Sequence, residues 1–278
     1  MNPEYKFKTK AASLLAGVSM FALSAGVSAL ETLPKDKSMS GMDIELVGRA
    51  DLWTYQSCDS YNESPLTQSY VDAGKLPPVN ERMPKEPWMA KKDQMVDGIG
   101  EYGGTFRHVI GGRPEGFNWL AGQSQGWGGI NIQLMESLTR LGPLWQVKAE
   151  EANPLPNLAK DWEFSNDRKS LTMYLLEGAR WSDGNMFDTE DIDFWWNDNV
   201  QDANVNSRLP KDALGAGTTL EILGPYSFKF NFDEPKGNAV LAQLAYMGGA
   251  PGPSHVMKSL HPSHNSDATY ESYANGMP

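Results

Sequence analysis

The chain has 278 residues, 40% hydrophobic and 21% charged, which is a globular composition with enough apolar residues for a sizeable core. Its net charge of −11 argues against a nucleic-acid partner and against binding to anionic lipid headgroups. The single cysteine, Cys58, excludes a disulfide within the chain, and we interpret it as a lone thiol in an irregular segment.

The first 29 residues have the features of a secretory signal peptide. Lysines are frequent in residues 1–10, residues 11–27 are apolar and small, and residues 27–29 are the small residues that a signal peptidase requires. An uncleaved membrane anchor is the alternative, but the apolar stretch is short and interrupted by serines. We therefore expect cleavage after Ala29 and export of the remaining chain.

Residues 30–98 are rich in Pro, Ser, Asp and Lys and show little sustained periodicity. We interpret them as an irregular N-terminal extension that either wraps on the body of the protein or acts as a spacer. The pattern changes near Ile99, so we expect the main domain to cover residues 99–278.

Strands and helices alternate in the predictions that follow Ile99. The β-branched and aromatic residues of 105–110 predict a first core strand. Apolar residues about one turn apart predict a helix over 128–141. Four residues form its apolar face: Ile130, Leu134, Leu138 and Leu141.

Two antiparallel hairpins are predicted farther along the chain. The first joins residues 155–164 to a strand over 171–176, and the second joins 220–223 to 226–232. Alternation along the last strand predicts one shared face for three aromatic residues: Phe228, Phe230 and Phe232. A helix is predicted over 239–247.

The stretch 178–198 places several carboxylates beside three tryptophans, and we compare three kinds of site with a helix start. An EF-hand calcium loop requires a ligand at its fifth position and glycine at its sixth. Counted from Asp183, these positions hold Phe187 and Asp188, so the pattern fails. A sugar platform and acid–base catalysis are the other two alternatives.

A capped helix accounts for these residues better. The carboxylate of Asp188 can accept from the amides of Glu190 or Asp191 as an N-cap, and acids in the first turn suit the helix dipole. Hydrophobic residues before and after the cap, Phe187 and Ile192, predict a hydrophobic staple. One helix face would bury four residues: Ile192, Trp195, Trp196 and Asn199. The preceding Trp-Ser-Asp-Gly at 181–184 predicts a tight turn with one residue at positive φ.

Residues 158–196 resemble the family 5 extracellular solute-binding proteins of bacterial ABC transporters, the dipeptide and oligopeptide binders. The shared features are a Leu-Ala-x-x-Trp start, a strand, a Gly-x-x-Trp-x-Asp-Gly turn, and Phe before an acid-rich helix start. In this sequence they are Leu158, Ala159, Trp162, Gly178, Trp181, Asp183, Gly184, Phe187, Glu190 and Asp191. Three further pieces agree in the same order: "GGTFR" at 103–107, "PEGFN" at 114–118 and "LEILGPYSFKFNFDEP" at 220–235.

The resemblance implies an α/β fold of the type II periplasmic-binding-protein kind. Such proteins have two lobes and are roughly twice as long, so we expect most of the first lobe here, truncated before the second. The implied function is a monomeric periplasmic receptor that captures a solute, without catalysis, cofactor or metal, and delivers it to an inner-membrane ABC permease. We expect a peptide ligand, with an oligosaccharide as the alternative.

Loops after the strands would form one wall of the ligand cleft in such a receptor. An exposed aromatic ring offers a flat apolar surface, and an amide can bind a ligand's backbone or hydroxyl groups. The candidate ligand-binding residues are Glu115, Phe117, Asn118 and Trp127. For each of them, an ordinary role in the core or in a turn is the alternative.

Two other classes of protein stay open. An exported glycoside hydrolase needs two carboxylates that face each other across a substrate, whereas the acids of 178–198 are adjacent along a helix start. A truncated remnant that binds nothing is the other class. Zinc is disfavoured because Pro262 separates His261 from His264, and we expect both histidines to be exposed in a loop.

Overall fold

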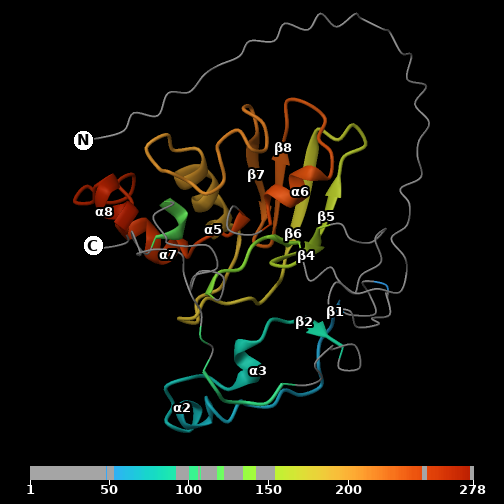
Figure 1. The fold of residues 1–278 in the computed structure, drawn as a ribbon, viewed down its shortest axis with the longest axis vertical. Helices are drawn as coiled ribbons and strands as arrows, with labels where there is room; N and C mark the ends of the chain where they lie inside the picture. The colour runs from blue at the N-terminus through green and yellow to red at the C-terminus, as the bar shows by residue number, and fades with distance from the viewer. Residues whose placement is uncertain are drawn as a thin grey trace, which may run out of the picture.

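An antiparallel sheet of four strands carries the core in this computed structural model (Figure 1). The strands pair in the order β5-β6-β8-β7. Their bounds are β5 (Ala159–Phe164), β6 (Ser170–Leu175), β7 (Thr219–Gly224) and β8 (Ser227–Asn231). The structure describes Gly48 and residues 53–91, 100–105, 107, 118–121, 134–141, 154–245 and 249–275.

Both predicted hairpins are confirmed. In the first, β5 pairs with β6 so that Trp162 lies opposite Met173, and in the second β7 pairs with β8. The turn between β5 and β6 contains Arg168 at a φ of 56°. This residue donates its backbone N–H to the carbonyl oxygen of Ser165 at 2.9 Å. Its guanidinium lies 4.0 Å from the ring centre of Phe164, a cation–π contact that supports the turn.

One face of the sheet is apolar because side chains alternate along each strand. This face buries Leu171, Met173, Leu175, Phe228 and Phe230. Phe232 is also buried, so the predicted shared face of the three phenylalanines is confirmed. The opposite face carries polar partners such as Thr172 beside Lys229.

The helix that follows the Trp-Ser-Asp-Gly turn covers the apolar face. It begins as α5 (Thr189–Asp193) and continues as the wider π-helical turn η4 (Phe194–Val200). The ring of Trp196 packs 4.9 Å from that of Phe230, which joins the helix to the sheet. The π-helical turn was not predicted from the sequence.

Shorter elements surround this sheet and helix. They are η2 (Trp119–Ala121), β3 (Thr139–Arg140), β4 (Leu155–Pro156), α6 (Ala239–Gln243), α7 (Ser254–Met257), η6 (Lys258–Leu260) and α8 (Tyr270–Asn275). In Figure 1, α7 and α8 lie on the same side of the sheet as α5. The helix predicted over 239–247 begins where expected, but α6 ends at Gln243.

The end of the helix predicted over 128–141 is wrong. Thr139 and Arg140 form β3, which pairs with β4. Leu138 is fully buried as predicted, whereas the side chain of Leu134 is 72% exposed and Leu141 is also exposed. Pairing with a strand that comes later in the chain overrides the local periodicity here, which is a common reason for such errors.

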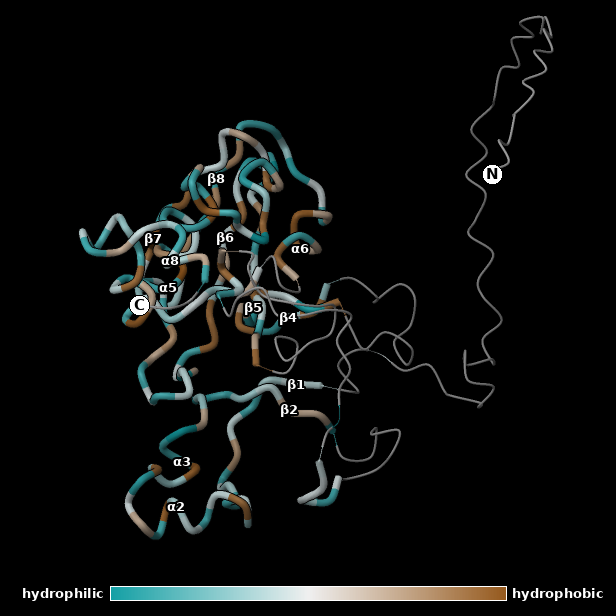
Figure 2. The backbone as a smooth tube through the Cα atoms, turned by 60° about the vertical axis from the view of Figure 1, so that its left-hand side comes forward, coloured by the Kyte–Doolittle hydropathy of each residue, from teal (hydrophilic) through white to brown (hydrophobic). Residues whose placement is uncertain are grey.

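The N-terminal extension contains more regular structure than the sequence indicates. Its elements are β1 (Trp53–Tyr55), α2 (Gln68–Asp72), α3 (Val79–Arg82) and β2 (Trp88–Ala90), and β1 pairs with β2. In both views α2 and α3 lie farther from the four-stranded sheet than β1 and β2 do (Figure 1 and Figure 2). A salt bridge at 2.6 Å between Arg82 and Glu63 closes the α2–α3 segment.

Several contacts join this extension to the body. The hydroxyl of Tyr55 donates to the carbonyl oxygen of Asn157 at 2.7 Å. The backbone N–H of Lys85 donates to the carbonyl oxygen of Glu177 at 3.1 Å. The guanidinium of Arg140 lies 5.1 Å from the ring centre of Trp88. Of the two alternatives considered above, these contacts favour an extension that wraps on the body.

Some predictions fall on residues outside the described ranges. They include the signal peptide at 1–29, the boundary near residue 98, and most of the strand at 105–110. Within the ranges that are described, no helix has the length and apolar character needed to cross a membrane.

Candidate functional site

The Trp-Ser-Asp-Gly turn at 181–184 has the predicted geometry. Gly184 adopts a φ of 92°, and its N–H donates to the carbonyl oxygen of Trp181 at 2.9 Å. The side chain of Asp183 accepts from the backbone N–H of Asn185 at 3.0 Å. An aspartate and a glycine are the residues that such a tight turn favours, so this prediction is confirmed.

The predicted N-cap is confirmed as well. The carboxylate of Asp188 accepts from the backbone N–H of Glu190 at 2.8 Å, and Asp188 and Asp191 together form a capping box. Phe187 and Ile192 are both buried on either side of the cap, as a hydrophobic staple requires. These acids therefore build a helix start.

The carboxylate of Asp191 also accepts hydrogen bonds from residues outside the helix cap. This residue is only 2% exposed, and its Oδ2 accepts from the indole N–H of Trp181 at 2.8 Å and from the backbone N–H of Asp188 at 3.3 Å. Its Oδ1 accepts from the backbone N–H of Ser254 at 2.7 Å. One buried carboxylate thus ties the turn, α5 and the start of α7 together, a role that sequence spacing alone did not reveal.

A histidine–carboxylate pair lies on the outer side of the same turn. Nε2 of His255 lies 2.6 Å from Oδ2 of Asp183. The hydrogen bond from His255, followed by the one from the backbone N–H of Asn185, lowers the pKa of Asp183 to about 2. Both side chains are partly exposed, so this pair is a surface contact between the turn and α7.

His261 corrects a prediction, because it is fully buried instead of exposed in a loop. Its ring packs edge-on against the rings of Phe194, Tyr270 and Tyr273. Burial lowers the pKa of His261 below its ordinary value. The neighbouring His264 is half-exposed and pairs with Asp198 at 3.0 Å.

Asn118 is the one candidate ligand-binding residue that the structure describes; Glu115, Phe117 and Trp127 lie outside the described ranges. It is 2% exposed. Its Nδ2 donates to the carbonyl oxygen of Tyr273 at 2.7 Å, and its Oδ1 accepts from the backbone N–H of Leu120 at 3.0 Å. The Asn118 amide thus joins η2 to α8.

Two buried polar atoms are without a hydrogen-bond partner in the described part of the chain: Nε1 of Trp119 and Nε2 of His261. Buried polar groups are almost always hydrogen-bonded, so these two nitrogen atoms are exceptions among the described residues. Both lie close to the contact between Asn118 and Tyr273, because Trp119 follows Asn118 and the ring of His261 packs on that of Tyr273.

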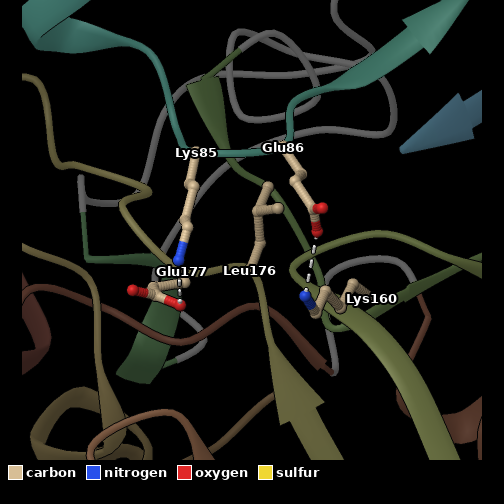
Figure 3. Close-up of a pocket in the computed structure, with 5 residues that line it drawn as sticks. All are labelled: Lys85, Glu86, Lys160, Leu176 and Glu177. Atoms are coloured by element: carbon tan, nitrogen blue, oxygen red, sulfur yellow. Dashed lines mark hydrogen bonds and ion pairs between the residues drawn. The ribbon is translucent and has the colours of Figure 1, made fainter. Parts of the chain in front are cut away.

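A small hollow of about 90 Å³ lies where the extension meets the start of β5 and the end of β6 (Figure 3). Its lining residues are Lys85, Glu86, Lys160, Leu176 and Glu177. The ammonium of Lys85 lies 3.7 Å from Glu177, and that of Lys160 lies 3.3 Å from Glu86. The two ion pairs lie on either side of the Leu176 side chain and join the extension to the body, so the lining charges are already paired within the protein (Figure 3).

No cluster of ligands suited to a metal ion occurs among the residues that the structure describes. The acids of the 178–198 stretch serve the turn and the helix start, and His264 and His255 pair with separate carboxylates.

Comparison with known proteins identifies the chain. Residues 153–276, which contain the four-stranded sheet, α5 and η4, match the family described as bacterial extracellular solute-binding proteins, family 5 middle. The predicted resemblance to the family 5 extracellular solute-binding proteins is confirmed over these residues. The predicted mixed α/β fold of this family is confirmed by the solved structures described next.

Two known proteins are similar to this chain along almost all of its length. The periplasmic alpha-galactoside-binding protein of Rhizobium meliloti (strain 1021) is 46% identical over 272 residues, which are 96% of this chain and 39% of that protein. The periplasmic binding protein MelB from Agrobacterium fabrum C58, solved in complex with stachyose, is 44% identical with a TM-score of 0.79. That match covers 89% of this chain and 37% of MelB.

An oligopeptide-binding protein OppA is less similar. Its structure is 32% identical with a TM-score of 0.60, and the match covers 76% of this chain and 30% of that chain. The chain therefore spans less than two fifths of the length of the relatives that it matches.

Proposed function

We propose that this protein acts as a periplasmic receptor that binds an α-galactoside oligosaccharide and delivers it to an inner-membrane ABC permease. The observation that carries this proposal is the 46% identity to an alpha-galactoside-binding protein over 96% of the chain. The structural similarity to MelB, which was solved with the tetrasaccharide stachyose, supports the same ligand class.

The proposal replaces the expected peptide with the alternative, an oligosaccharide. The oligopeptide-binding relative is more distant, with 32% identity against 44% for the stachyose-bound MelB, and its match covers less of this chain. The acid-rich helix start that led to the family is scaffold in the structure, so it does not discriminate between the two ligand classes.

The proposed cleft wall consists of the loop before η2 and the segment after it. Aromatic rings at Phe117 and Trp127 would pack on the apolar faces of sugar rings, and Glu115 would accept hydrogen bonds from sugar hydroxyl groups. We propose an anchoring role for Asn118, since its amide already bonds to Tyr273 and Leu120. In this arrangement α8 holds Asn118 through the carbonyl oxygen of Tyr273.

Binding without catalysis is part of the proposal. A carboxylate glycosidase needs two carboxyl groups that face each other across the bond to be cleaved. In the described part of 178–198, Asp188 and Asp191 are occupied by backbone and indole donors, and Asp183 is occupied by His255 and Asn185. The relatives are named as binding proteins, which fits a receptor.

Export by the signal peptide completes the proposal. The two relatives are named as periplasmic proteins, and residues 1–29 have the features of a cleavable signal. The mass of the protein recovered from the periplasm should correspond to a chain that begins at Leu30.

Isothermal titration calorimetry of the complete product of this gene with stachyose tests the ligand class. We expect saturable binding and a ligand-dependent rise in melting temperature, because a ligand that binds only the folded state at about 100 times its Kd stabilises that state by about 2.7 kcal/mol. An unrelated oligopeptide serves as the control and should give neither effect. Tight binding of the peptide without binding of stachyose would restore the peptide hypothesis, and release of galactose would favour a glycosidase.

A further inference from the structure

Three of the four histidines in the chain lie within ten residues, and each one lies near an aspartate of the 183–202 segment. His255 pairs with Asp183 at 2.6 Å, His264 pairs with Asp198 at 3.0 Å, and Nε2 of His261 lies 3.9 Å from Oδ2 of Asp202. The first two pairs are partly exposed, whereas the ring of His261 is fully buried. His261 therefore differs from the other two histidines in its burial.

The hydrogen bond at Nδ1 of His261 indicates that the imidazole ring is neutral. Its Nδ1 accepts from the backbone N–H of Ser263 at 3.2 Å, so Nδ1 carries a lone pair and the hydrogen is assigned to Nε2. Nε2 makes no hydrogen bond of good geometry within the described residues, since Asp202 at 3.9 Å is too far, but the backbone of Asp198 favours a proton on the ring and raises the pKa of His261 against the effect of burial. An added proton would have to bind Nδ1, where it would face the N–H of Ser263.

The charges around His261 have opposing effects on its proton affinity. Asp198 and Asp202, from η4 and the loop after it, favour the protonated ring, and His264 opposes it. Tyr270 and Tyr273 of α8 pack against the ring, and the hydroxyl of Tyr270 donates to Asp202 at 2.7 Å. Burial among these rings is the largest effect and lowers the pKa of His261.

A continuous set of contacts leads from His261 to the proposed cleft wall. The ring of Tyr273 lies 4.6 Å from that of His261, and its hydroxyl donates to Oδ1 of Asn199 in η4. The carbonyl oxygen of Tyr273 accepts from Asn118, which immediately precedes η2. Loss of His261 from its site would therefore remove a packing contact of α8, and α8 is the element to which Asn118 is bonded.

We propose that His261 is an acid-sensitive latch: its neutral ring holds α8 on η4 and, through Tyr273 and Asn118, holds the proposed cleft wall in position for the ligand. The ligand part of this inference rests on the proposed function. The latch itself rests on the packing of His261, Tyr273 and Asn118.

The direction of the pH effect follows from linkage. A histidine whose pKa is lower in the folded state than in the unfolded state binds fewer protons when folded. The stability that His261 contributes is therefore fully present above its ordinary pKa of about 6.5, and it is lost as the pH falls through the lowered value. Ligand affinity depends on the protonation of the folded protein, so it should fall as the pH approaches the lowered pKa of His261.

Titration of the complete gene product with stachyose at about pH 7.5 and about pH 5.5 tests this coupling. Stachyose has no group that titrates in this range, so any change in Kd belongs to the protein. We expect affinity that is about fivefold weaker at the lower pH, which is the lower end of the usual coupling between two sites of a protein. In His261→Gln the amide does not titrate, so the Kd of this variant should differ by less than about twofold between the two pH values.

Two matched variants control for surface histidines. His255→Gln and His264→Gln remove the partly exposed pairs and should retain the pH dependence of the wild-type protein. If His261→Gln retains the full wild-type pH dependence, or if wild-type affinity is the same at both pH values, the latch is overturned.

Two measurements without ligand separate the latch from the proposed function. The difference in urea midpoint between wild type and His261→Gln should change between the two pH values; a constant difference overturns the latch even if stachyose binds. Nuclear magnetic resonance of the wild-type ring should show the neutral Nε2–H tautomer near neutral pH, and an Nδ1–H or charged ring there would also overturn it. Failure of stachyose to bind at either pH, with these two results as expected, refutes the proposed ligand and leaves the latch supported.

Discussion

At the scale of single residues, the carboxylate of Asp191 accepts more hydrogen bonds than any other carboxylate in the 178–198 stretch. It accepts from the indole of Trp181 and from the backbone N–H groups of Asp188 and Ser254 while it is almost completely buried. Charged acceptors form stronger hydrogen bonds than neutral ones, and a buried donor that loses its acceptor keeps the full cost of its desolvation.

Asp191→Ala should therefore lower the free energy of unfolding by about 3 kcal/mol or more. The matched variant Asp188→Ala removes the solvent-exposed N-cap hydrogen bond to Glu190. It should lower the free energy of unfolding by about 1 kcal/mol, without a change in ligand affinity. Urea unfolding followed by tryptophan fluorescence measures both values. Equal losses in the two variants would contradict the bridging role of Asp191, and a selective loss of binding in Asp188→Ala would return a ligand role to this stretch.

At the scale of elements, η4 places three consecutive large aromatic residues in the core: Phe194, Trp195 and Trp196. An α-helix with 3.6 residues per turn would direct at least one of three successive side chains away from the sheet. The wider π-helical turn changes this spacing, and such turns occur as single units within α-helices. The packing of Trp196 on Phe230 fixes the helix on the apolar face of the sheet.

Trp196→Ala should cost about 3–5 kcal/mol, because it leaves a cavity between η4 and β8 that the sheet cannot close. Tyr174→Ala, on the polar face of β6 where the side chain is 38% exposed, should cost about 1 kcal/mol or less. Thermal and urea unfolding of both variants measure the difference. Similar losses would show that the helix does not depend on this contact.

Local patterns predicted the elements that are stabilised locally. The Asp188 cap, the turn at Gly184 and the two hairpins follow from residues that are neighbours in the sequence. The failures involve distant partners: β3 pairs with β4 across an intervening segment, and His261 is buried by α8 and η4. Periodicity carries no information about such partners.

The candidate site was less predictable than the fold. The sequence proposes Asn118 as a ligand contact, which stays a prediction, and it did not indicate that the Asn118 amide bonds to Tyr273, a residue 155 positions later in the chain. For Asp191, the sequence predicted a place in the first turn of its helix but not the hydrogen bond from Ser254. A buried polar residue chooses its partners by tertiary packing, so its role becomes visible only with the fold.

At the scale of the whole molecule, the extension is held on the body at Gly178. This glycine adopts a φ of 86°, and an added Cβ would lie 3.1 Å from the backbone nitrogen of Lys85 and 3.3 Å from Cα of Pro84. Backbone atoms cannot move aside as freely as a side chain can. The close approach permits the hydrogen bond from Lys85 to Glu177 and the ion pairs shown in Figure 3.

Gly178→Ala should weaken this docking and speed the proteolytic cleavage of residues 53–91. The matched variant Gly184→Ala has the same left-handed strain, at a φ of 92°, but no atom lies within 4 Å of its added Cβ. Both variants should lose about 1–2 kcal/mol from the positive φ, and only Gly178→Ala should expose the extension. Limited proteolysis with mass spectrometry distinguishes them, and equal protection of 53–91 in the two variants would contradict the docking role.

The attachment of the extension also sets an order of events in folding. The hydroxyl of Tyr55 bonds to Asn157, which comes 102 residues later, and Glu86 bonds to Lys160, which comes 74 residues later. Residues made first thus cannot complete their contacts until the β5–β6 hairpin has been synthesised, and such long sequence separations slow the search for the native state. A chaperone that binds residues 53–91 during this interval would cover a segment whose contacts with the body have not yet formed.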